Sequence, residues 1–73
     1  MERDPNERSN RIMRLVELIE HINKTIDVHK DESNPDRFVI EQYMERRAEY
    51  LNELALLLQP LGVALQWQPQ QAA

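Results

Sequence analysis

Side chains able to carry out catalytic chemistry are scarce in this chain. The 73 residues include two histidines, one glycine and no cysteine. Phosphate-binding loops need several glycines, and the few serines and histidines assemble no triad without arbitrary choice. Glu17 and His21 lie one helical turn apart, as two metal ligands could, but neither His21 nor His29 follows the Glu-x-x-His pattern of di-iron bundles. We therefore predict a non-enzymatic protein with no catalytic residue, metal or cofactor.

Arg47 is the charged residue with the most unexpected position. At about 100° per residue it points into an apolar face, since these residues project within roughly 60° of it: Ile40, Tyr43, Met44, Leu51, Leu54 and Leu58. Glu20 is the nearest expected counter-ion, followed by Glu17 and Asn23. We predict an ion pair of Arg47 with Glu20 that fixes the helix register, because a misaligned pair strands a charge. The alternative is an anion or acidic-peptide site at the centre of a bundle.

Charge is unevenly distributed along the sequence. Thirteen acidic and nine basic residues give a formal net charge of −4, and no charged residue follows Glu53. Four glutamates recur at every fourth position: Glu41, Glu45, Glu49 and Glu53. This acidic stripe is either a solubilising surface or a docking surface for a basic partner.

The basic residues cluster near the beginning of the chain, at Arg3, Arg8, Arg11 and Arg14. A nucleic-acid-binding hairpin dimer that uses Arg8, Arg11 and Arg14 is the alternative function. Interspersed acids dilute this cluster, and nucleic-acid sites usually combine denser positive charge with stacking aromatic residues. Nucleic acid is therefore not the partner we expect.

The remaining pattern predicts two helices of similar length. Asp4-Pro5 begins the first helix, which extends to about residue 29 and repeats its apolar residues at alternating spacings of three and four. Residues 30–34 form a polar turn. Asn34 is the expected N-cap of the second helix, with Pro35 at its first position, and Pro60 and Gly62 end it near residue 60. The predicted core is Ile12, Leu15, Ile19, Ile22, Ile26, Ile40, Met44, Leu51, Leu54 and Leu58.

Residues 63–73 form an uncharged tail that we expect to be partly extended and then disordered. Trp67, the only tryptophan, either folds back onto the helices or contacts a partner.

We predict an all-α fold: an antiparallel two-helix hairpin in residues 1–62 that dimerises into a four-helix bundle. A chain this short buries little surface alone and has no disulfide, so self-association is the expected route to stability. No apolar stretch has the length of a membrane span or a secretion signal, which predicts a cytoplasmic protein. The expected function is that of a structural or interaction module, an adaptor or regulatory subunit. The sequence leaves open a homodimer or hetero-oligomer, and either helix pairing across a dimer.

Overall fold

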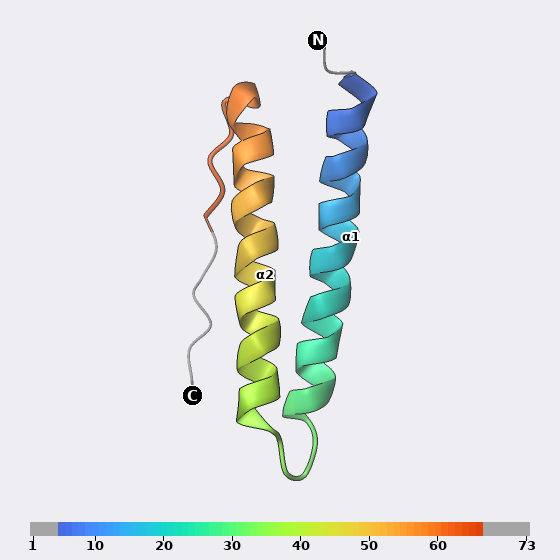
Figure 1. The fold of residues 1–73 in the computed structure, drawn as a ribbon, viewed down its shortest axis with the longest axis vertical. Coiled ribbons are helices and arrows are strands. Elements are labelled where there is room, and N and C mark those ends of the chain that lie inside the picture. Colours follow the sequence, from blue (N-terminus) through green and yellow to red (C-terminus); the bar gives the residue numbers. More distant parts are fainter. Residues whose placement is uncertain (1–4, 67–73) are drawn as a thin grey trace.

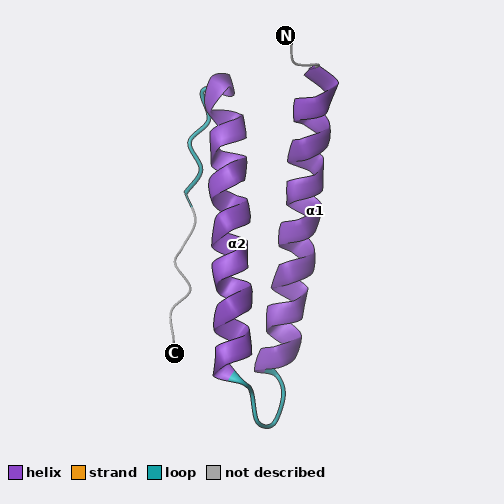
Figure 2. Ribbon diagram, in the orientation of Figure 1, coloured by secondary structure: helices purple, strands orange, loops and turns teal. Residues whose placement is uncertain are grey.

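The computed structural model describes residues 5–66, which form two long helices and one short one. Helix α1 spans Pro5–Lys30, α2 spans Arg37–Leu58, and the 3-10 helix η1 spans Gln59–Leu61. The two long helices lie side by side and antiparallel (Figure 1). Within the described range only helices and loops occur (Figure 2). The predicted all-helical hairpin is therefore confirmed.

Helix α1 begins at the predicted proline and continues one residue beyond the predicted end. Glu7 lies in the first turn, and His29 and Lys30 lie in the last. The charges of Glu7 and Lys30 oppose the partial charges of the helix dipole at the two ends. Thr25 donates its hydroxyl hydrogen to the carbonyl of His21 at 3.0 Å, so this polar side chain is satisfied within the helix.

Helix α2 begins two residues later than predicted. The N-cap is Asp36 rather than Asn34, because the Asp36 carboxylate accepts hydrogen bonds from the backbone N–H groups of Phe38 and Val39 at 3.0 and 3.3 Å. Pro35 consequently lies before the helix instead of at its first position. Either residue type can cap a helix, so composition alone did not distinguish them.

The chain reverses direction after α2. Gly62 adopts φ 79°, a left-handed conformation that glycine accepts without strain, and its N–H donates to the carbonyl of Gln59 at 2.9 Å. Residues 63–66 then run back along α2 on the side away from α1 (Figure 1). They form no strand, although Leu65 is half-buried. Trp67 and the rest of the predicted tail lie outside the described residues.

The predicted core divides into two groups. Leu15, Ile22, Ile26, Ile40 and Leu54 are buried, and Leu15 is completely enclosed. The other five are only half-buried: Ile12, Ile19, Met44, Leu51 and Leu58. One hairpin thus covers the centre of its apolar surface and leaves the flanks of that surface partly accessible.

Candidate interaction surfaces

Two antiparallel helices in contact have two broad lateral faces, and in this hairpin the two faces differ in chemistry. Lys30 ends α1 and Arg37 begins α2 at the same end of the molecule, so residues whose numbers add to about 67 lie level with each other. Ile12 is therefore level with Ala55, and Ile19 with Ala48. This register gives the height of each residue along the hairpin, and the rotation of each helix gives the side on which the residue lies.

One side is the apolar face. By helical rotation of about 100° per residue, it consists of Ile12, Val16, Ile19, Met44, Ala48, Leu51 and Ala55. Six of these residues are half-buried, and Val16 is 41% exposed. None carries a charge or a hydrogen-bonding side chain. The face offers packing surface but no chemistry that would bind an ion or polar ligand.

Arg47 lies near the turn-proximal end of the apolar face. Its Nη1 donates to the Oδ1 of Asn23 at 2.7 Å, joining α2 to α1, and Asn23 belongs to the apolar side by its rotation. Arg47 is half-buried, whereas Glu20 is exposed. Asn23, which was expected as a partner of Arg47 after Glu20, is thus hydrogen-bonded to it in the structure. The register role proposed for Arg47 and Glu20 remains a prediction.

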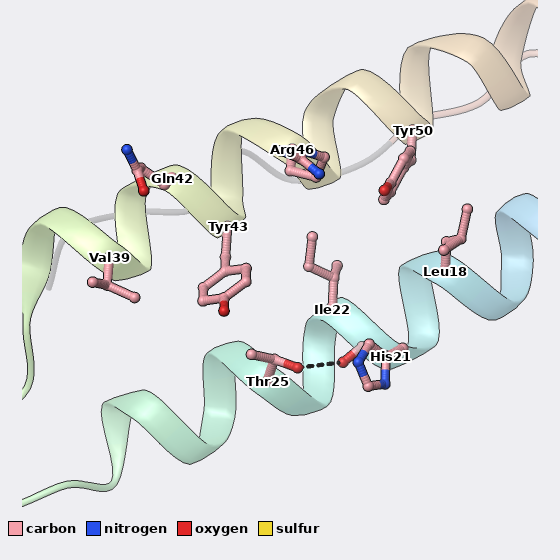
Figure 3. Close-up of a pocket in the computed structure, with 9 residues that line it drawn as sticks. All are labelled: Leu18, His21, Ile22, Thr25, Val39, Gln42, Tyr43, Arg46 and Tyr50. Atoms are coloured by element: carbon pink, nitrogen blue, oxygen red, sulfur yellow. Dashed lines mark hydrogen bonds between the residues drawn. The ribbon is translucent and has the colours of Figure 1, made fainter.

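The opposite side is the groove face, a shallow depression of about 480 Å³ between the helices (Figure 3). Its lining combines apolar, aromatic and polar side chains: Leu18, His21, Ile22, Thr25, Val39, Gln42, Tyr43, Arg46 and Tyr50. His29 stacks on Tyr43 near one end, with ring centroids 5.5 Å apart. The groove face is therefore more polar than the apolar face.

A bidentate ion pair crosses between the helices toward their free ends. Nε and Nη2 of Arg11 donate to the two carboxylate oxygens of Glu53 at 2.6 and 2.8 Å. These hydrogen bonds lower the pKa of Glu53 and raise the pKa of Arg11. Both side chains remain more than 40% exposed, so solvent screens their attraction.

The Arg11–Glu53 pair changes how two predicted surfaces are composed. Glu53 belongs to the predicted acidic stripe and Arg11 to the predicted nucleic-acid face, yet the two side chains pair with each other. The numbers 11 and 53 fall near the register that joins level residues, and this signal could have revealed the pair. Glu41, Glu45 and Glu49 remain exposed.

The other arginines proposed to bind nucleic acid are Arg8 and Arg14. Arg14 lies 3.6 Å from Glu17, one turn further along the same helix, and Arg8 is half-buried. With Arg11 also paired, two of the three guanidinium groups have carboxylate neighbours on this chain. The nucleic-acid alternative itself remains a prediction.

Comparison with known proteins identifies no relative. The chain matches no protein-family model, and no curated protein or solved structure is significantly similar to it.

Among residues 5–66, no three histidine, aspartate or glutamate side chains are grouped to hold a metal ion. Neither long helix has an apolar segment of the length needed to cross a membrane.

Proposed function

We propose that this chain is a non-enzymatic interaction module that functions through self-association. Two hairpins pair on their apolar faces and form a four-helix bundle. The observation that supports this proposal is the uncharged apolar face, on which predicted core residues such as Ile19 and Leu51 remain only half-buried. A second layer of helices completes their burial, as in other bundles built from hairpins.

The apolar face occupies the central part of one side of the hairpin. On α2 its residues extend over 12 positions, from Met44 to Ala55, which is about 18 Å at 1.5 Å per residue. It therefore supplies the apolar centre of an interface, and the polar residues around it supply the rim.

The choice of face follows from desolvation. Burying the groove face would cover Arg46, Gln42 and His21, whose polar groups would then need new partners. The apolar face carries no such cost, and Ala48 and Ala55 allow a second helix to approach closely. A second copy is favoured over a charged partner for this face, because it supplies an equally uncharged surface.

A pair of charge-matched variants tests the proposal. Ala48→Glu places a carboxylate in the apolar face, and Gln42→Glu adds the same charge to the same helix on the groove side. Light scattering coupled to size exclusion, over a hundredfold range of concentration, measures the mass of each variant and of the wild type. We expect a wild-type dimer, an unchanged Gln42→Glu variant and at least a hundredfold weaker association of Ala48→Glu, because each dimer would bury two unpaired charges.

Circular dichroism of the same samples records whether the hairpin persists when association is lost. A helical Ala48→Glu monomer and an unfolded one both agree with the proposal, since either follows from loss of pairing. A wild-type monomer throughout the range, or a dimer that Ala48→Glu leaves intact, would overturn it.

A further inference from the structure

We propose that two copies pair with their turns at opposite ends, related by a two-fold axis that passes through the level of Val16 and Leu51. This inference rests on the proposed self-association and adds the orientation of the partner. In this arrangement α1 packs antiparallel on α1 of the second copy, and α2 on α2. The alternative two-fold dimer has both turns at one end and packs α1 on α2 of the second copy.

The apolar face is nearly symmetric about the level of Val16 and Leu51. On α1, Ile12 precedes Val16 by four positions and Ile19 follows it by three. On α2, Ala48 precedes Leu51 by three positions and Ala55 follows it by four. The proposed axis therefore places Ile12 beside Ile19 of the second copy and Ala48 beside Ala55. Large residues pack together along α1, and small residues allow close approach along α2.

Apolar contact alone does not distinguish the two arrangements, since the same-end dimer also places apolar residues together. Charge distinguishes them. By helical rotation, the turn-proximal part of this side carries Asp27 and Lys30 on α1, and Arg37 and Glu41 on α2. In the register of the hairpin, Lys30 is level with Arg37, and Asp27 lies within one residue of the level of Glu41.

The same-end dimer brings like charges together. Because it packs α1 on α2 of the second copy at equal height, Lys30 faces Arg37 and Asp27 faces Glu41, and symmetry repeats each contact. Like charges directly opposed across an interface are unfavourable. The opposite-end dimer removes these contacts, because each turn-proximal group then lies beside the free end of the second copy.

Asn23 supports the same orientation. Its side chain accepts the hydrogen bond from Arg47 and is exposed in the single hairpin. The same-end dimer places Asn23 level with Met44 of the second copy, where its amide would lose water without gaining a polar partner. The opposite-end dimer places it level with Ser9, whose hydroxyl can hydrogen-bond the amide.

A distance between the two turns tests the orientation. The chain has no cysteine, so Ser33→Cys in the exposed turn provides one spin-label site per copy. The distance along the axis of α1 from Val16 to the end of the helix is about 21 Å at 1.5 Å per residue, and the turn adds a few ångströms. Pulsed electron–electron double resonance should therefore give a distance of about 50 Å between the two labels in the opposite-end dimer. The same-end dimer predicts less than about 30 Å.

Disulfide formation tests which residues lie at the axis. Oxidised Val16→Cys should give a covalent dimer on non-reducing gels, because the two Val16 positions adjoin across the axis. Met13→Cys is the matched control, since Met13 is 63% exposed and lies on the outer side of the same helix. We expect no efficient cross-linking from this control.

The spin-label distance also has a control. Mixing the spin-labelled Ser33→Cys chain with an excess of unlabelled chain should remove the long distance, which would show that the distance is intermolecular.

The outcomes separate this inference from the proposed function. A dimer with a short distance between the turns overturns the opposite-end orientation and leaves self-association intact. The same holds for a dimer in which a Val16→Cys chain, mixed with a Leu51→Cys chain, forms a disulfide only with that second chain. A chain that is monomeric by light scattering overturns both.

Discussion

Leu15 is the side chain whose loss should reveal most about the stability of the hairpin. It is completely buried, so replacement by alanine removes apolar side-chain volume from the core. Buried Leu→Ala substitutions cost about 2–5 kcal/mol. Because the site lies between only two helices that can partly collapse, we expect the lower part of this range, about 2–3 kcal/mol.

This loss is large for a protein of this size. At about 0.05–0.15 kcal/mol per residue, the 62 described residues correspond to a total stability of roughly 3–9 kcal/mol. Leu15→Ala should then remove about a fifth or more of the free energy of unfolding. With a urea m-value of about 1 kcal/mol/M, the midpoint should fall by about 2–3 M.

Urea unfolding followed by circular dichroism measures this shift at one fixed chain concentration, because association also contributes to apparent stability. Met13→Ala is the control, since Met13 is 63% exposed and its truncation should change stability by no more than ~0.5 kcal/mol. If Leu15→Ala does not fold, Leu15→Met should still fold with a cost below ~1.5 kcal/mol. Equal shifts for Leu15→Ala and Met13→Ala would refute the assignment of Leu15 to the core.

Three further predictions follow from individual contacts. The pKa of Glu53 lies below the ordinary glutamate value, so the stability that its ionised form contributes is present at neutral pH and is lost as the pH falls through the lowered pKa. Arg11→Gln should return the pKa of Glu53 toward the ordinary value. An NMR titration in which Arg11→Gln leaves the pKa of Glu53 unchanged would contradict the ion pair. Asp36→Ala should cost about 0.5–2 kcal/mol by thermal or urea unfolding and Asp36→Asn much less, because Asp36 caps α2. Gly62→Ala should destabilise the chain reversal after η1 by about 1 kcal/mol, because alanine is strained at the positive φ of this position. No atom lies within 4 Å of an added Cβ, so the cost comes from the backbone conformation and not from a clash. Faster proteolysis or hydrogen exchange near residue 62 would reveal the loss, and Gly62→Asn should have a smaller effect.

The repeating apolar pattern was sufficient to predict the two helices and the face that each one buries. Every predicted core residue is buried or half-buried, because a spacing of three and four residues leaves one face of a helix apolar whatever its neighbours are. The start of α2 was less predictable, since Asn34 and Asp36 are equally suitable caps and only backbone geometry selects between them.

Contacts between the helices were harder to predict than the helices themselves. Arg11 and Glu53 are 42 positions apart, and their pairing depends on the relative height and rotation of α1 and α2. Arg47 contacts Asn23, one turn from the predicted Glu20, for the same reason. A long side chain reaches several positions on a neighbouring helix, so periodicity identifies the region of contact but not the partner atom.

The short turn also determines the order in which the hairpin can assemble. Ile26 and Ile40 are buried close to the turn and only 14 positions apart, whereas Leu15 and Leu54 are 39 positions apart. Closing a short loop costs less entropy than closing a long one, so contacts near the turn should form first and the helices should zip toward their free ends. Opening should proceed in the reverse direction. The Arg11–Glu53 ion pair lies toward the end that closes last, so it should form late in folding and open early in unfolding.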